Sequence, residues 1–335
     1  MKNKSKDELY CGVRKKKIQK ACPELNLKSL EMFIWYISER YQIHIKKDIL
    51  NKEPPFTDDP ILKEYRFTNI RREHDRETKW LIQNIAHNDF LTYRQRLLNC
   101  VLFRIYNKHE SMEIIKAPFK FEGVWHITDA KNRIKAFQQS HPRYVWYTNA
   151  FMTSGMKRVM GLSYPKESNV AVLPLRLLKT LNESTFFKDI KACKNQAEVY
   201  ELLKNTNAIG EFLAYQIYVD FTYIEEFPFS ENEFTVAGPG CRKGIDYLFK
   251  DKDGMTYEEC LFWLRDNWDR IPDLYELDDW FDPKEEMLDL KHYDRVMNVM
   301  CLENCFCEFS KYYRACMEIG RPRNKYRFDS KKKPI

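Results

Sequence analysis

The chain has 335 residues, enough for one large domain or two small ones with a substantial hydrophobic core. Only ten residues are glycine, which argues against an all-β fold with its many tight turns and favours helices. No apolar run reaches the length of a membrane-spanning helix, and the formal charge of +7 is very unevenly distributed.

Positive charge is concentrated at the two ends. Residues 1–20 and 321–335 carry +6 each, so the 300 residues between them carry −5, most of it in residues 266–289 with −8. We therefore expect a basic arm (1–25), a helical domain (26–320) and a basic tail (321–335). Basic ends suit a polyanion, but solvated tails look the same. The acidic stretch is interpreted as a solvated loop, with a cover that mimics DNA charge as the alternative. The N-terminus lacks the apolar segment of a secretory signal, which predicts an intracellular protein.

Helices are predicted wherever apolar residues recur at helical spacing or a capping residue begins such a run. A helix capped by Thr68 or Asn69 is expected to run through Ile85. The other predicted helices cover 26–41, 91–106, a stretch starting at Thr128, 173–181, 185–193, 245–249, 257–268 and 290–317.

Charged residues on the helix that follows Asn69 form the first candidate site. Arg72, Asp75 and Arg76 are spaced i, i+3 and i+4, so a helix would place them on one face, with Asn69 one turn below. Such charges usually form a surface ion-pair ladder. Aromatic flanks favour packing into the body of the protein instead, and they are Tyr65, Phe67 and Trp80.

A helical hairpin is predicted around residues 205–217. Turn-forming residues 205–207 end a short amphipathic helix, and Gly210 begins a second one. Amide groups at such a helix N-terminus suit a phosphate, which is how helix-hairpin-helix modules hold one DNA strand. The candidate DNA-binding residues are Asn207, Ile209, Gly210 and Tyr215. The alternative is an ordinary hairpin in which Gly210 only eases packing.

A glycine-rich stretch follows the hairpin. Three of the ten glycines stand beside two cations, and the residues involved are Gly238, Pro239, Gly240, Arg242, Lys243 and Gly244. The stretch predicts a rigid loop with exposed amides, and such a loop suits a phosphate or a pyrophosphate. A glycine-rich loop alone is a weak signal, but its position behind the hairpin strengthens it.

Other motifs mainly exclude functions. The ten cysteines are expected to be reduced thiols. Four cluster near the C-terminus without the spacing of an iron–sulfur site, and the seven histidines are scattered, so no metal site is predicted. The sequence has no phosphate-binding P-loop, which excludes an isolated kinase activity of that class, and no hydrolase or dinucleotide fingerprint.

Three groups of segments carry a resemblance to a known family. They are Phe67-Thr-Asn69 with Arg72, Asp75 and Arg76; Asn207 to Ile217 with Asp220, Phe234, Ala237-Gly-Pro-Gly-Cys241 and Gly244; and Cys307-Glu-Phe-Ser-Lys-Tyr312. Over about residues 60–320 the chain resembles the alpha-glutamyl/putrescinyl thymine pyrophosphorylases, or amino acid:DNA transferases. The same module is described as the helical domain of 5-hydroxymethyluracil DNA kinases.

The resemblance implies an all-α fold like that of the helix-hairpin-helix DNA glycosylases. Ile209-Gly210 and Ala214 fall where the glycosylase hairpin has its Val-Gly and Ala. Those glycosylases use an Asp behind the hairpin, where this chain has Ala237-Gly238. This departure argues against base excision and agrees with a transferase.

The resemblance also implies a place in thymine hypermodification by bacteriophages and related systems. A 5-hydroxymethyluracil in DNA is phosphorylated to a pyrophosphoryloxymethyl base, and the transferase replaces the pyrophosphate with an amine from an amino acid or a polyamine. The implied partners are double-stranded DNA containing modified thymine, a small amine donor and a hydroxymethyluracil DNA kinase. The implied location is the cytoplasm of an infected cell, or the nucleus in a eukaryotic host, with no membrane partner.

Two roles follow for the candidate residues. Fixed cations and amides would stabilise the leaving pyrophosphate. The first candidates for this role are in the glycine-rich stretch: Gly238, Gly240, Arg242 and Lys243. Arg72 and Arg76 are the second candidates. A carboxylate would keep the incoming amine neutral, with Asp75 first and Asp220 behind it. Asp75 could equally orient the two arginines, and Asn69 completes the set.

The reaction also requires a site for the modified base and compensation of the pyrophosphate charge. Tyr215 or Phe67 could hold a base that has left the DNA stack. A divalent metal is compatible with pyrophosphate, but no cofactor is predicted.

Two alternatives stay open at this point. The chain could be a DNA glycosylase, which the missing Asp disfavours. It could also be a non-catalytic DNA-binding module that directs a separate kinase, although the polar set of Arg72, Asp75 and Arg76 favours an enzyme.

Overall fold

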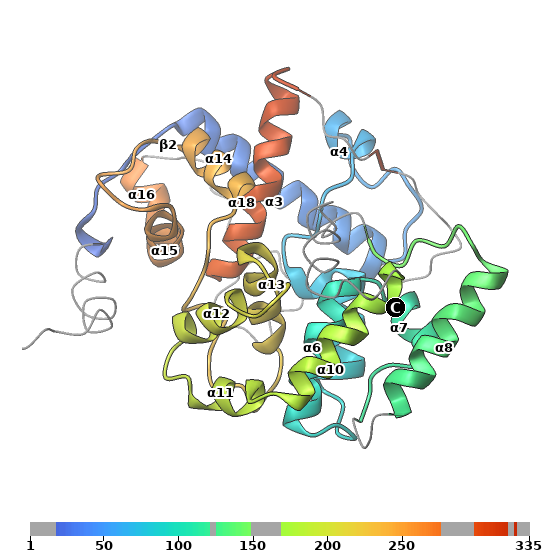
Figure 1. Cartoon of the computed structure of the whole chain (residues 1–335). Coiled ribbons are helices and arrows are strands. Elements are labelled where there is room, and N and C mark those ends of the chain that lie inside the picture. The colour runs from blue at the N-terminus through green and yellow to red at the C-terminus, as the bar shows by residue number, and fades with distance from the viewer. Residues whose placement is uncertain (1–17, 121–124, 149–168, 276–297, 321–324, 327–335) are drawn as a thin grey trace, which may run out of the picture. The chain divides into compact units, whose positions relative to one another are not determined.

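The structure, a computed structural model, describes residues 18–120, 125–148, 169–275, 298–320 and 325–326. Across these residues it is helical apart from one two-stranded sheet, which confirms the predicted all-α class (Figure 1). No described helix is long and apolar enough to cross a bilayer.

The chain divides into two compact units, each considered by itself. Unit 1 comprises Met1–His74 and Phe234–Pro334, and unit 2 comprises Asp75–Glu233. The single domain predicted for residues 26–320 stays a prediction, and the basic tail and most of the basic arm lie outside the described residues.

Unit 1 brings an N-terminal segment together with the C-terminal part of the chain. Its short antiparallel sheet joins the two, because Leu25 pairs with Phe249. The elements of unit 1 are β1 (Glu24–Leu25), α3 (Leu27–His44), a π-helix (Ile45–Ile49), α4 (Pro60–Glu64), a 3-10 turn (Arg72–His74), α14 (Pro239–Leu248), β2 (Phe249–Asp251), α15 (Tyr257–Asn267), a 3-10 turn (Trp268–Arg270), α16 (Ile271–Tyr275) and α18 (Val299–Cys316).

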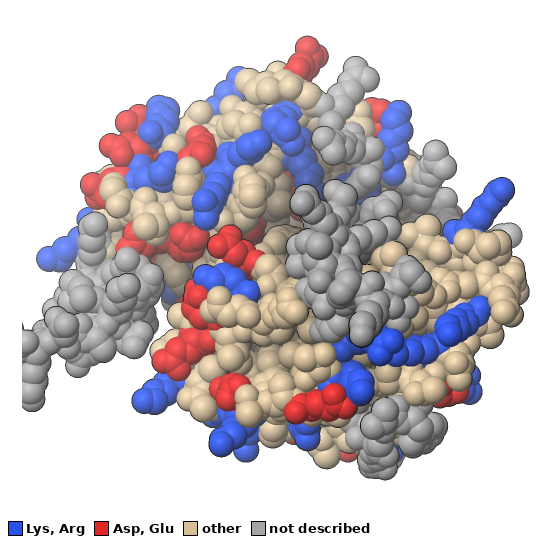
Figure 2. Space-filling model, viewed as in Figure 1, with Lys and Arg blue, Asp and Glu red and all other residues tan. Residues whose placement is uncertain are grey.

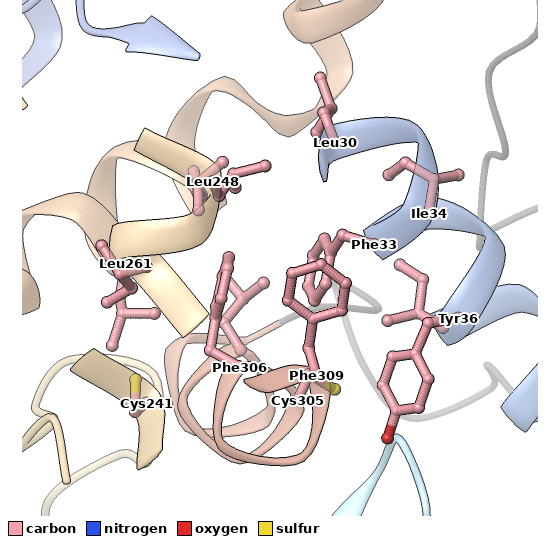
Figure 3. Packing of buried hydrophobic residues seen from close by; sticks show 14 of the residues in the cluster. Leu30, Phe33, Ile34, Tyr36, Cys241, Leu248, Leu261, Cys305, Phe306 and Phe309 are labelled. Atoms are coloured by element: carbon pink, nitrogen blue, oxygen red, sulfur yellow. The ribbon is translucent and has the colours of Figure 1, made fainter. Parts of the chain in front are cut away.

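Helix α18 forms the centre of the hydrophobic core of unit 1. Its side chains Phe306 and Phe309 are 0 % exposed and lie against Phe33 of α3 (Figure 3). The ring centroids of Phe33 and Phe306 are 4.5 Å apart in a stacked arrangement, and Phe309 meets Phe33 edge-on at 5.1 Å. Aromatic pairs of this kind add stability beyond the area they bury, so they fix α18 against α3.

The predicted glycine-rich loop is wrong, because this stretch is helix α14. Gly238 is its N-cap and Pro239 occupies its first turn, where a missing amide hydrogen costs nothing. A Cβ at Gly240 would lie 2.6 Å from the Sγ of Cys307, and one at Gly244 would lie 2.3 Å from the carbonyl oxygen of Phe306. Both glycines therefore allow α14 to pack directly against α18.

Unit 2 contains the predicted hairpin. Helices α12 and α13 pack against each other, and Gly210 is the N-cap of α13 as expected. The elements of unit 2 are α5 (Arg76–Leu81), a π-helix (Ile82–Ala86), α6 (Tyr93–Tyr106), α7 (His109–Ile115), α8 (Trp125–Ser140), a 3-10 turn (Val170–Val172), α10 (Leu173–Glu183), α11 (Phe186–Ala192), α12 (Gln196–Lys204) and α13 (Glu211–Phe221).

Two predicted helix starts are corrected. Helix α8 already includes Thr128 instead of starting from it. The helix expected from Thr68 or Asn69 is interrupted, because Asp75 has extended backbone angles and separates a 3-10 turn from α5. Arg72, Asp75 and Arg76 therefore do not share one face of a continuous helix.

Candidate functional site

Those segments of the family resemblance that belong to unit 1 meet around α18, whereas the hairpin segment belongs to unit 2. Asn304 of α18 donates from Nδ2 to Oγ1 of Thr68 and to the backbone oxygen of Asn69, both at 3.2 Å. Cys307, also on α18, lies against Gly240 of α14. One helix thus holds the Thr68–Asn69 segment, the start of α14 and the Cys307–Tyr312 segment together.

Asn69 is buried and organises its own loop. Its Oδ1 accepts from Nη2 of Arg40 at 2.6 Å, and its Nδ2 donates to the backbone oxygen of His74 at 3.0 Å. These bonds span the 3-10 turn that carries Arg72, whose side chain is 7 % exposed. Asn69 therefore supports the backbone that positions Arg72.

The N-terminus of α14 is occupied by two carboxylates. The amide of Ala237 donates to Oε1 of Glu258 at 2.9 Å, and the amide of Gly238 donates to Oε1 of Glu303 at 3.2 Å. Negative charge is favoured at this end of a helix because amide hydrogens there lack helical partners. We call Arg72, Gly238, Glu258 and Glu303 the α14 cluster.

Glu303 has an unusual electrostatic environment. Burial raises its pKa to about 7, against the opposing effects of the Gly238 amide and the positive charge of Arg72. The carboxylates of Glu258 and Glu308 add to the increase. The residue is nevertheless half-buried rather than sealed, so it combines solvent access with a pKa suited to proton transfer at neutral pH.

The residues predicted to bind pyrophosphate lie at the start of helix α14 instead of in a loop. The amide of Gly238 donates to Glu303, and Gly240 packs against Cys307 of α18. Arg242 and Lys243 are exposed, and Figure 2 shows Lys and Arg side chains gathered over α14 and α18. Nε of Arg242 donates to the backbone oxygen of Ala237 at 2.9 Å, which holds its guanidinium near the start of α14.

Arg76 takes part in an ion-pair cluster of unit 2. Its Nη2 lies 3.0 Å from Oε1 of Glu77 and 3.6 Å from Oε1 of Glu110. Glu77 also accepts from the backbone amide of His109 at 2.8 Å, and this amide belongs to the first residue of α7. The hydrogen bond that the His109 ring donates to Glu77 raises the pKa of His109. Burial opposes ionisation of Glu77, but its bonds to His109 outweigh that effect and lower its pKa.

The geometry of Glu77, His109 and Glu110 would also permit a metal ion, because one ligand atom from each lies within 4.8 Å of the others. Arg76 already supplies positive charge to both carboxylates. Glu77 moreover caps α7, whose N-terminus repels cations. We therefore assign these residues to a helix cap that joins α5 to α7.

Asp220 lies in the core of unit 2. Its side chain is 0 % exposed, and its two oxygens accept from Nε and Nη2 of Arg104 at 2.6 and 2.5 Å. Arg104 also donates to Oδ1 of Asn107 at 2.7 Å. This bidentate pair fastens α13 to α6, and the geometry gives Asp220 a structural role rather than a proton-accepting one.

The predicted DNA-binding residues differ in exposure. Asn207 and Gly210 are exposed, whereas Ile209 and Tyr215 are 4 % and 3 % exposed. Phe67, the other ring considered for holding a base, is also buried, against Tyr36 in unit 1. Neither ring can stack on a base without a rearrangement of its unit, while Asn207 and Gly210 are accessible from solvent.

Sequence reasoning missed Glu258, Glu303 and Arg40. Glu303 stands in a Glu-Asn pair within an amphipathic helix, which is the usual pattern of a solvated face. The available signal was the spacing of four residues between Glu303 and Cys307, which places both on one face of the helix. The structure shows that this face lies against Gly240. Arg40 lies on α3, where no acidic residue stands three or four positions away from it.

Comparison with known proteins now identifies the family. The model of the 5-hmdU DNA kinase helical domain matches residues 27–321. The chain belongs to this family. The predicted resemblance to this helical module is thereby confirmed.

One curated relative is the 5-hmdU DNA kinase of Bacillus phage SP10, which is 26 % identical over 305 residues. The matched region covers 87 % of this chain but 46 % of that protein, so the chain spans less than half of the relative's length. No solved structure matches the chain significantly.

Proposed function

We propose that this protein replaces the pyrophosphate of 5-pyrophosphoryloxymethyluracil in DNA with an amine. The amine comes from an amino acid or a polyamine, and the reaction follows phosphorylation of 5-hydroxymethyluracil by a kinase. The substrate is double-stranded DNA containing the modified thymine. The reaction takes place where phage DNA is modified, in the cytoplasm of the infected cell.

The observation that carries this proposal is that the family segments of unit 1, around Asn69, Gly238 and Cys307, come together at the α14 cluster. Breaking the methylene–oxygen bond places negative charge on pyrophosphate, and a buried arginine stabilises such charge better than one in water. Arg72 occupies this environment beside carboxylates that can handle protons. Arg242 and Lys243 near the start of α14 are the proposed surface contacts for pyrophosphate.

The hairpin supports a DNA partner through Gly210. This residue has φ −99°, which every amino acid adopts, and no described atom lies within 4 Å of a Cβ built on it. Packing in the described fold thus gives no reason for glycine here, although glycine is one of the residues favoured at a helix N-cap. Close approach of a DNA phosphate to the amides of α13 would give a further reason.

The name of the SP10 relative raises the possibility of a kinase. The chain corresponds to less than half of that protein and has no P-loop. We therefore assign phosphorylation to a partner protein or domain, and amine transfer to this chain. A non-catalytic module that delivers DNA to the kinase is the second candidate, supported by the same family match.

The test uses DNA carrying 5-pyrophosphoryloxymethyluracil, incubated with the purified protein and a mixture of amino acids and polyamines. Nucleoside masses after digestion and pyrophosphate release are measured in parallel, with unmodified DNA as the control. We expect a new amine-bearing nucleoside and one pyrophosphate for each. DNA binding without any change in the base would instead favour the delivery module, and release of a free base would favour a glycosylase.

A further inference from the structure

We infer that Glu303 accepts the proton of the incoming amine, so that the α14 cluster is the amine subsite of the proposed transferase. This inference rests on the proposed function and assigns the proton acceptor to α18. It replaces Asp75, for which the sequence had suggested this role. Asp75 instead lies at the start of α5, next to the ion-pair cluster of Arg76.

Position is the first argument. Glu303 is held at the N-terminus of α14 by the Gly238 amide, where α14 packs on α18 and two segments of the family resemblance meet. It is half-buried, and so is Glu258 on the neighbouring amide of Ala237. Each carboxylate uses Oε1 for its amide. A pair of carboxylates is the chemistry that attracts an ammonium group.

The reaction needs the combination that the cluster provides. A donor amine is mostly an ammonium ion at neutral pH and cannot attack until it loses a proton. Glu303 takes that proton, the free nitrogen electron pair forms a bond to the methylene carbon, and the carbon–oxygen bond breaks. The electron pair of that bond leaves with pyrophosphate, which Arg72 helps to stabilise. The products are the base with its new secondary amine in the protonated form, pyrophosphate and one proton on Glu303.

The charges around Glu303 poise it for this step. Burial and the negative charges of Glu258 and Glu308 favour its neutral form, while Arg72 favours the carboxylate. The thiols of Cys241 and Cys307 also face it, but burial raises the pKa of each, so they stay neutral at working pH. The carboxylate therefore forms near pH 7, where it can hold a proton and release it again.

The experiment compares two nucleophiles in the pyrophosphate-release assay. One is an alkylamine, which is an ammonium ion at neutral pH, and the other is hydroxylamine, which is already neutral there. With Glu303→Gln we expect the rate with the alkylamine to fall by roughly 100-fold or more, the size of a general-base contribution. With hydroxylamine we expect a much smaller loss, because no proton has to be removed first.

The pH dependence gives a second readout. With the alkylamine, the rate of the unaltered protein should rise as pH increases to about 7 and then level off. With Glu303→Gln the rate should keep rising above pH 7, because this variant depends on the free amine, whose share grows up to a pKa of about 10. Glu258→Gln should move the rise to lower pH, because it removes a negative charge that holds the pKa of Glu303 up. A purely structural role for Glu303 would produce neither change.

The outcomes separate the two levels of the hypothesis. If Glu303→Gln slows both nucleophiles equally, or neither, the assignment of Glu303 is wrong while amine transfer stands. If the unaltered protein uses no amine, the transferase itself is refuted and the role of Glu303 falls with it. Far-UV circular dichroism of the variant checks that its helices are intact.

Discussion

The glycines of α14 and the glycine of the hairpin look alike in the sequence but occupy opposite environments. At Gly240 and Gly244 a Cβ would collide with Cys307 and with the backbone of Phe306, whereas at Gly210 it would meet no described atom. Packing accounts for the first two and leaves the third unexplained. Packing requires glycine at Gly240 and Gly244, whereas the helix N-cap favours glycine at Gly210 without requiring it, which leaves room for a partner there.

The same contrast applies to the charged residues of the two regions. In the hairpin, Asp220 is sealed in a bidentate pair with Arg104. At α14, Glu303 is half-buried and has a pKa near neutrality. The hairpin therefore has a rigid interior beneath an accessible turn, whereas the start of α14 places a reactive carboxylate within reach of solvent.

The largest effect is expected from breaking the ion pair beneath the hairpin. Asp220→Asn leaves the guanidinium of Arg104 buried without its counter-charge, which should lower the free energy of unfolding by about 3–5 kcal/mol. Urea denaturation monitored by circular dichroism measures the change. Glu201→Gln, which breaks an exposed pair with Lys204 on α12, is the matched control and should cost less than about 1 kcal/mol. Equal costs for the two variants would contradict the structural role of Asp220.

A somewhat smaller loss is expected at the α14–α18 contact. Gly244→Ala places a methyl group against the carbonyl of Phe306, and backbone cannot move aside as a flexible side chain can. We expect a loss of about 3 kcal/mol, at the upper end for overpacking. Gly240→Ala should cost less, since only the Sγ of Cys307 lies under 3 Å from the new atom. Thermal unfolding of the two variants should rank them in this order, and the reverse order would show that the helices adjust.

These contrasts explain what the sequence could and could not predict. Helical periodicity placed α3, α6 and the hairpin, because each of them buries an apolar face. Glycine spacing did not distinguish an anion-binding loop from close helix packing, since both require a missing side chain. The partners of Glu303 and Asp220 lie far away in the sequence, and local patterns carry no information on such contacts.

Glu303 should also make stability depend on pH. Because its folded pKa is raised to about 7, the folded protein holds this proton more tightly than the unfolded chain does. The contribution of Glu303 to the free energy of unfolding is fully present below the ordinary pKa of Glu. It falls by roughly 1–3 kcal/mol as pH rises through about 7. Glu303→Gln should remove this loss and be the more stable protein at pH 8. Denaturation at pH 5 and pH 8 tests it, and an unchanged pH dependence in the variant would contradict the raised pKa.

Among these substitutions, Gly210→Ala should have the smallest effect on stability. It should weaken DNA binding while leaving the fold nearly as stable as before. Gly210→Ala meets no described atom and needs no unusual backbone angle, so it should cost less than about 1 kcal/mol, mainly as a poorer helix cap. If a DNA phosphate lies against this backbone, the added methyl group should weaken binding to duplex DNA severalfold while the melting temperature stays nearly constant. Fluorescence anisotropy with a labelled duplex measures the affinity. Gly254→Ala is not a suitable control because Gly254 has φ +69°, so Gln139→Ala at an exposed position of α8 in the same unit serves instead. Unchanged affinity in Gly210→Ala would remove Gly210 from the DNA-binding surface and leave the helix cap as its role.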